Sequence, residues 1–245
     1  MINTMSISFF ILLFIVALLY ASVGHGGASG YLALMAIYGF APDIMKPSAL
    51  ILNLFVSLTS FIMFYKGGHF KWKLFLPFAL ASIPFSFLGG TISLDAVIYK
   101  KVLGVLLLLP VIRFFFYPNT EEASLKSNNF MLSLLIGAII GFLSGLIGIG
   151  GGIILSPVLL LLNWTNQKQT AAISALFIFV NSIAGLIGQL SKGVQIDHSV
   201  YSFVVIAFVG GLAGAFLGSL KFNQNILKYT LAIVLLMASV KLILN

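Results

Sequence analysis

Two glycine-rich stretches, one in each half of the chain, decide how the fold is interpreted. The first reads Tyr20-Ala-Ser-Val-Gly24-His25-Gly26-Gly27-Ala-Ser29-Gly30. The second reads Leu143-Ser-Gly-Leu-Ile-Gly148-Ile-Gly150-Gly151-Gly152-Ile-Ile-Leu-Ser156-Pro157. Each stretch interrupts an otherwise apolar run. In membrane proteins, glycine-broken hydrophobic segments at matching positions of two halves are a pointer to a solute-binding site.

The composition around these stretches is that of an integral membrane protein. Of the 245 residues, 60% are hydrophobic and 7% are charged, and the mean hydropathy is +1.15. A soluble domain carries about 25% charged residues. We therefore expect a multi-pass protein of the cell inner (plasma) membrane. The first 20 residues have no positively charged start and precede further apolar runs, so they predict a transmembrane helix rather than a signal peptide.

The charge balance excludes one class of partner. The formal net charge is +8, from 13 Lys and Arg against 5 Asp and Glu. These cations lie in short loops and at the ends of apolar runs, where anionic membrane lipid and the positive-inside bias account for them. No basic stripe is available to a phosphate backbone, so we expect no nucleic-acid partner. The chain has no cysteine, which excludes a disulfide or a thiolate metal site.

Eight apolar runs approach the roughly 20 residues that a helix needs to cross the hydrocarbon core. They cover 5–23, 46–66, 72–92, 96–117, 129–147, 169–190, 199–220 and 225–244. A shorter apolar piece follows each glycine stretch, at 28–40 and 152–163, and its length fits a half-helix or a re-entrant segment. The predicted fold is all-α: a polytopic membrane protein with about eight transmembrane helices plus two short broken segments, in two pseudo-symmetric repeats.

Landmarks that recur in the same order in both halves predict an internal duplication. Residues 98–113 align without a gap on 226–241, Phe87-Leu-Gly aligns on Phe216-Leu-Gly, and Gly68 aligns on Gly193. We assign the first repeat to 1–118, a polar linker to 119–128 and the second repeat to 129–245. The repeats are parallel with four crossings each and inverted with five. The positions of the loop lysines favour inverted repeats.

The glycine stretches have a chemical interpretation. A helix that restarts after a break directs free N–H groups and the positive end of its dipole into the gap, where they attract anions. The alternative is that these glycines only permit close packing of helices. The candidate substrate-binding residues of the two stretches are Gly24, His25, Gly26, Gly27, Ser29, Gly148, Gly150, Gly151 and Gly152.

The second stretch, from Gly148 through the glycine triplet to Pro157, resembles the repeated motif of the sulfite exporter TauE/SafE family. The chain length and the arrangement of spans are also similar to that family. The resemblance implies a membrane carrier for small anions such as sulfite and sulfonated organic acids, and it implies export as the direction. The first half departs from the motif, because Ala28 replaces the third glycine, Ala33 stands in the place of Pro157, and His25 in that of Ile149.

His25 is the one histidine of the sequence within an apolar region, since His69 and His198 fall in loops. Its imidazole could carry a proton or, when charged, bind an anion. The alternative is a neutral ring that bonds to a freed backbone carbonyl and keeps the break in shape. We expect no metal site, because neither a second histidine nor a carboxylate lies nearby in the sequence.

Polar side chains within the spans complete the candidate site. Asn53, Asn181 and Ser182 are costly in hydrocarbon and should face the bundle interior, where they could donate hydrogen bonds to an oxyanion. The alternative is a role in bonding helices together. We expect the Lys46 side chain to extend toward the lipid headgroups. All five carboxylates fall in loops or at span ends, which argues against a carboxylate proton relay.

Together these features predict a secondary transporter of small anions, most directly sulfite or organosulfonates, that works by alternating access between two repeats. An anion channel and a non-transporting membrane assembly partner are the alternatives. No nucleophile, metal cluster or acid–base pair lies inside the spans, so we expect neither an enzyme nor a cofactor. The expected partners are a small anionic substrate and membrane lipid. The sequence does not determine whether the protein forms a homo-oligomer.

Overall fold

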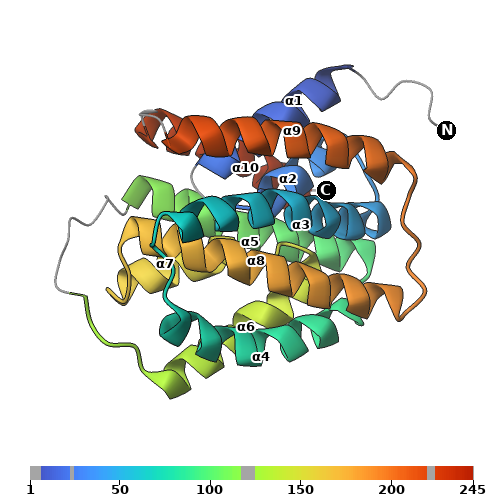
Figure 1. Cartoon of the computed structure of the whole chain (residues 1–245). Helices are drawn as coiled ribbons and strands as arrows, with labels where there is room; N and C mark the ends of the chain where they lie inside the picture. Colours follow the sequence, from blue (N-terminus) through green and yellow to red (C-terminus); the bar gives the residue numbers. More distant parts are fainter. Residues whose placement is uncertain (1–6, 23–24, 117–124, 220–223, 245) are drawn as a thin grey trace.

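The computed structural model describes residues 7–22, 25–116, 125–219 and 224–244, and within them the chain is helical with no strand (Figure 1). The first half holds α1 (Ile7–Ser22), α2 (Ala28–Ile37), α3 (Pro42–Lys66), α4 (Trp72–Gly90) and α5 (Ala96–Phe116). The second half holds α6 (Phe130–Ile147), α7 (Gly152–Leu161), α8 (Gln167–Leu190), α9 (Ser199–Ser219) and α10 (Gln224–Leu244). The all-α prediction is confirmed.

Five helices are long and apolar enough to cross a membrane over their described residues: α3, α4, α6, α8 and α9. Of the remaining expected spans, 5–23 and 96–117 include residues outside the described part, and 225–244 lies within α10, whose side chains are described only in part. The described part of the first is a helix of 16 residues, Ile7–Ser22. A multi-pass membrane protein follows from the five long helices, while the count of eight spans stays a prediction.

Each glycine stretch is followed by a short helix, as the sequence predicts. The helices α2 and α7 have 10 residues each, about 15 Å of helix, which is half of the hydrocarbon thickness. A glycine is the N-cap residue of both helices, Gly27 for α2 and Gly151 for α7.

Each short helix returns toward the side on which the preceding helix began. In the first half, Ser8 Oγ lies 2.7 Å from Tyr38 Oη, and the rings of Phe9 and Phe40 are 5.3 Å apart. These contacts join the start of α1 to the end of α2. In the second half, Lys126 N donates to Asn163 O at 2.8 Å, which joins the segment before α6 to the end of α7.

Glycines bring several helices into close backbone contact. On α6, a Cβ atom at Gly137, Gly141 or Gly145 would overlap a carbonyl oxygen of α4. A Cβ atom at Gly210 or Gly214 of α9 would overlap carbonyl oxygens of α1 in the same way. At these five positions glycine allows the helices to pack closely, as small residues commonly do in membrane proteins.

The centre of the molecule is formed by α3 and α8, which lie side by side and run antiparallel (Figure 1). Asn53 of α3 contacts Ser182 of α8. Leu50, one turn earlier on α3, lies 3.5 Å from the position of a Cβ at Gly185, one turn later on α8. Residue numbers therefore rise along α3 as they fall along α8. Both breaks lie against this pair of helices.

Candidate functional site

The two breaks have backbone conformations that favour glycine. Gly27, Gly148, Gly150 and Gly151 have φ angles of 92°, 87°, 73° and 77°, in the left-handed region. No side chain caps the start of α2 or of α7. In α7, the first backbone N–H groups with a partner are those of Ile154 and Leu155, which donate to Gly151 O. The earlier N–H groups of this helix have no partner within the helix itself.

The breaks from the two halves meet at one place. A Cβ atom at Gly26 would lie 2.8 Å from Asn53 Oδ1 and 2.8 Å from Ile178 Cγ2. A Cβ atom at Gly150 would lie 2.5 Å from Asn53 Nδ2 and 2.9 Å from the same Ile178 atom. Any larger residue at either glycine would therefore displace Asn53 or Ile178. Both breaks are held against the middle of α3 and α8.

Three buried polar atoms beside the breaks have no hydrogen-bond partner in the described part of the chain. They are Asn53 Oδ1, Tyr31 Oη and Ser144 Oγ. Tyr31 Oη lies beside Gly27, and Ser144 lies beside Gly151. A buried polar group without a partner costs about 1–3 kcal/mol. Three of them gathered at two helix breaks are typical of a site that a polar ligand or water completes.

Asn53 can present either a donor or an acceptor to the two breaks. Its Nδ2 donates to Ser182 Oγ at 3.2 Å, and its Oδ1 faces Gly26. A half-turn of the amide would exchange the two atoms, and Ser182 could then donate to the oxygen while the N–H₂ group faced Gly26. The structure thus brings together Asn53, Ser182, Gly26 and Gly150.

His25 links the first break to the second half. Its Nε2 lies 2.9 Å from Ser156 Oγ on α7, and that oxygen also contacts Gly152 O and Ser174 Oγ, both at 2.8 Å. A carbonyl oxygen can only accept, so the single hydroxyl proton of Ser156 goes to Gly152. In that arrangement His25 is in the tautomer that has its proton on Nε2 and donates it to Ser156 Oγ. The contact suits both interpretations of His25, a support for the break and a proton carrier.

Asn181, Ser29 and Gly148 have other neighbours than Asn53 and Ile178, whereas Gly152 shares Ile178 with Gly26 and Gly150. Asn181 faces α4, where its Nδ2 donates to Ser82 Oγ at 3.0 Å and to Phe177 O at 2.8 Å. Ser29 Oγ lies 2.8 Å from Tyr20 Oη, between α2 and α1. Gly148 lies against the backbone of Lys46, and Gly152 against Ile178. Gly24 lies outside the described residues.

Sequence reasoning did not assign Tyr31, Ser144 and Ser156 to the site. Each lies within one helical turn of a break glycine, on the helix that enters or leaves the break. That proximity was the available signal. It is weak, because tyrosine and serine are common in membrane helices and pack there without binding anything.

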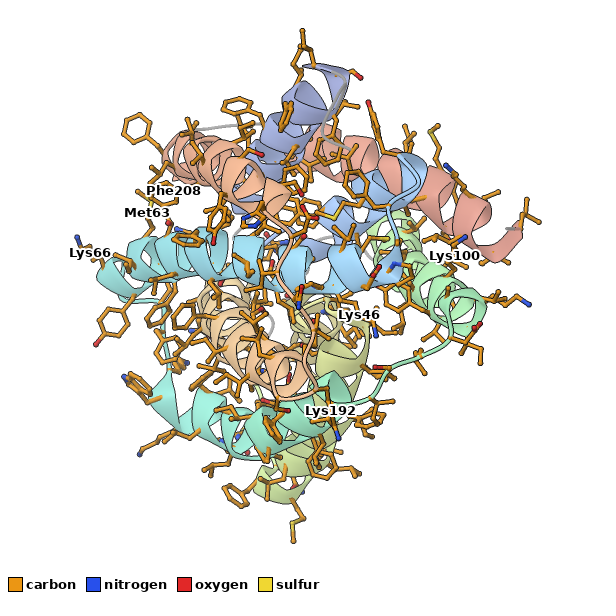
Figure 2. All side chains as sticks on the ribbon, turned by 90° about the vertical axis from the view of Figure 1, so that its right-hand side faces the viewer. Lys46, Met63, Lys66, Lys100, Lys192 and Phe208 are labelled. Atoms are coloured by element: carbon orange, nitrogen blue, oxygen red, sulfur yellow. The ribbon has the colours of Figure 1, made fainter. Side chains whose placement is uncertain are left out.

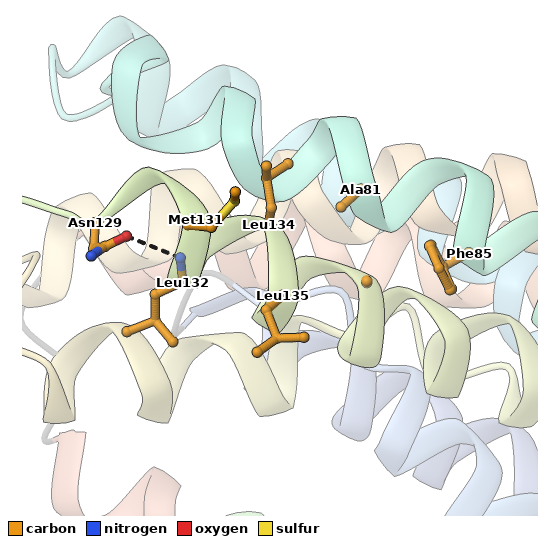
Figure 3. A pocket seen from close by; sticks show the side chains of 8 residues that line it. Ala81, Phe85, Asn129, Met131, Leu132, Leu134 and Leu135 are labelled. Carbon is orange, nitrogen blue, oxygen red and sulfur yellow. Dashed lines mark hydrogen bonds between the residues drawn. The ribbon is translucent and has the colours of Figure 1, made fainter.

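An apolar groove of about 800 Å³ lies elsewhere, between α4 and α6 (Figure 3). Its lining residues include Phe85, Met131, Leu132 and Leu135, all of which are exposed. Asn129, at one end, already accepts a hydrogen bond from Leu132 N at 3.1 Å. Apart from the Asn129 amide the groove is lined by apolar side chains, and its composition is that of a surface in contact with lipid.

The described carboxylates are each engaged near the start of a helix. Asp43, Asp95 and Asp197 accept hydrogen bonds from backbone N–H groups of Ile44, Val97 and Ser199. Over the described residues, no group of three or more His, Asp and Glu side chains could hold a metal ion.

Two helix breaks that meet inside a bundle of apolar helices define a class: multi-pass α-helical membrane proteins with a polar site between broken segments. The comparisons specify the family. The model of the sulfite exporter TauE/SafE family matches residues 9–242, and the chain belongs to that family. The resemblance seen in the second glycine stretch is thereby confirmed.

Curated relatives agree with this assignment. The probable membrane transporter protein y4hK of Sinorhizobium fredii is 37% identical over 98% of this chain and 99% of the relative. The probable membrane transporter protein MJ0441 of Methanocaldococcus jannaschii is 31% identical over 87% of this chain and 84% of the relative. The sulfite exporter TauE/SafE family protein 5 of Arabidopsis thaliana is 30% identical over 39% of this chain and 21% of the relative. No solved structure matches significantly.

Proposed function

We propose that this membrane transporter is a secondary carrier of small anions, with sulfite or an organosulfonate as the substrate and export as its direction. The family name supports the substrate class and the direction. The observation that carries the proposal is the meeting of two uncapped helix starts at Asn53. Three buried polar atoms there, Asn53 Oδ1 among them, lack partners within the described residues.

The chemistry of this point suits an anion. Free N–H groups at the starts of α2 and α7 and the positive ends of their dipoles favour negative charge. The Asn53 amide, the Tyr31 hydroxyl and the Ser144 hydroxyl can each donate to an oxyanion oxygen. Each of the described carboxylates accepts a hydrogen bond from a backbone N–H group at the start of a helix.

The two halves act as inverted repeats that rock against each other. The pairing of helices supports this. In such repeats α1 corresponds to α6 and α4 corresponds to α9. The helix α4 packs along α6, and in the same way α9 packs along α1. The counterpart helices α3 and α8 pack antiparallel on each other, which is the relation that inverted repeats require. Rocking about the α3–α8 contact would expose the central site to one side of the membrane at a time.

Flux into proteoliposomes tests the proposal. Purified protein is reconstituted, and uptake of radiolabelled sulfite and of a sulfonate is measured with and without an imposed pH gradient. We expect saturable uptake that unlabelled sulfur oxyanions suppress. Uptake no greater than in empty liposomes, with the protein shown to be folded, would overturn the proposal. Flux that rises linearly without saturation would indicate an anion channel instead.

A further inference from the structure

Lys46 is a buried cation that the central site does not use. It lies in the first turns of α3 and is only 9% exposed, so its side chain does not extend outward toward headgroups as the sequence predicts. Figure 2 shows the contrast with Lys66, which projects from the edge of the molecule at the other end of the same helix. Within the described part of the chain, no carboxylate pairs with Lys46. The nearest in sequence, Asp43, is exposed and accepts from Ile44 N.

The surroundings of Lys46 hold it against the second break without neutralising it. Its Nζ lies 4.8 Å from the centroid of the Tyr99 ring. The Tyr99 hydroxyl donates to Ile147 O at 2.9 Å, so the last carbonyl of α6 already has a donor. A Cβ atom at Gly148 would lie 3.2 Å from both Lys46 Cα and Lys46 O. A ring face attracts the ammonium but leaves its full charge in place.

The register of α3 against α8 brings a second group to the same level. Asn53 meets Ser182, and Leu50 lies opposite Gly185. Continued by one turn, this antiparallel register brings Gln189 to the level of Lys46. Gln189 is buried, and neither its Oε1 nor its Nε2 has a hydrogen-bond partner among the described residues. An ammonium and an amide N–H₂ group together are suitable donors for an oxyanion.

Lys46 and Asn53 lie on the same face of α3. They are seven residues apart, which is two turns or about 10 Å along the helix. The central site contains neutral donors only, apart from His25, and Lys46 is the nearest lysine to it along α3. A single face of α3 therefore presents a charged group near one end of the bundle and a neutral amide in its middle.

We propose that Lys46 and Gln189 form an outer binding site for a small oxyanion with at least one full negative charge, two helical turns from the central site. This inference rests on the proposed function. Lys46 supplies the attraction that brings the anion between the two halves, and the anion then passes along α3 to the donors around Asn53. The site selects for charge, while the central site selects for size and shape.

The test compares Lys46→Met and Lys46→Arg in proteoliposomes of phosphatidylcholine, with Lys66→Met as the matched control. The probe is radiolabelled sulfite. We expect the half-saturating concentration to rise about 10- to 100-fold in Lys46→Met, because a hydrogen bond to a charged group is lost. Lys46→Arg should stay within about threefold of the wild type, since the charge is kept. The half-saturating concentration of Lys66→Met should equal that of the wild type.

Gln189→Leu keeps the inference testable if Lys46→Met does not fold. Leucine has a side-chain volume similar to that of glutamine but offers no hydrogen-bond donor. The half-saturating concentration should rise about 3- to 10-fold. Unchanged half-saturation in folded Lys46→Met or Gln189→Leu would overturn the outer site. An effect of Lys46→Met that appears only when phosphatidylglycerol is added would assign Lys46 to a lipid headgroup, which also overturns it. Absence of sulfite and sulfonate flux in the wild type would instead overturn the proposed function and, with it, this inference.

Discussion

At the residue scale, two asparagines that look alike in the sequence have different surroundings. Asn53 lies where both glycine breaks meet, next to Gly26 and Gly150. The amide oxygens of both asparagines lack a hydrogen-bond partner among the described residues, so the difference lies in their neighbours. Asn181 donates to Ser82 Oγ and to Phe177 O, which bonds α8 to α4 and to its own preceding turn. The first environment suits a ligand, and the second suits helix association.

Alanine substitutions should separate these two roles. We expect Asn53→Ala to raise the half-saturating concentration for sulfite about 10- to 100-fold, since a donor to a charged ligand is worth about 1.5–3 kcal/mol. Asn181→Ala should lower the thermal stability in detergent and leave half-saturation within about threefold. Sulfite flux and a thermal denaturation curve measure both effects. Equal loss of affinity in the two variants would assign both asparagines to the same role.

Gly150 and Gly39 offer a matched pair for a second experiment. Both have a positive φ, 73° and 78°, so alanine strains the backbone equally at each, by about 1–2 kcal/mol. A Cβ at Gly39 meets nothing within 4 Å, whereas one at Gly150 would lie 2.5 Å from Asn53 Nδ2. We expect both variants to lose stability, and only Gly150→Ala to lose sulfite affinity as well. Retained affinity in Gly150→Ala would mean that Asn53 does not contact the substrate.

At the element scale, the sequence predicted the helices and their breaks well, because these depend on local features. Apolar runs of the right length become membrane helices, and glycine clusters end them. Which face of a helix meets which neighbour depends on packing that no local pattern records. Lys46 illustrates this: its position at the start of a span predicted an exposed side chain, and the approach of α5 with Tyr99 covers it instead.

His25 belongs to this scale, because it joins the segment before α2 to α7 through Ser156. It is also a titratable side chain at a break within the apolar part of the chain, where proton coupling would need one. We expect His25→Gln, which keeps a donor for Ser156 but cannot titrate, to transport sulfite while losing the response to an imposed pH gradient. Proteoliposome uptake at fixed and at different pH on the two sides measures this. A pH response equal to that of the wild type would leave His25 with the supporting role alone.

At the scale of the whole molecule, the relation between the halves is the remaining question of topology. Landmarks in the sequence predicted a duplication, but similar residues align equally well in parallel and inverted repeats. The antiparallel contact of α3 with α8 supports the proposed inverted arrangement, because each of these helices follows the short helix of its half. In inverted repeats such counterparts run in opposite directions, and their carboxyl ends emerge on opposite sides of the membrane.

Labelling of single introduced cysteines can test whether the repeats are inverted. The natural chain has no cysteine, so no other residue of this protein would react. Lys66 ends α3 and Lys192 follows α8 by two residues, and both side chains are exposed. We expect a membrane-impermeant maleimide added outside intact cells to label only one of Lys66→Cys and Lys192→Cys, and to label both after permeabilisation. The antiparallel register requires this result, because the two carboxyl ends then lie a membrane thickness apart. Labelling of both variants from the same side of the membrane would be incompatible with inverted repeats, and alternating access by rocking of inverted halves would have to be abandoned.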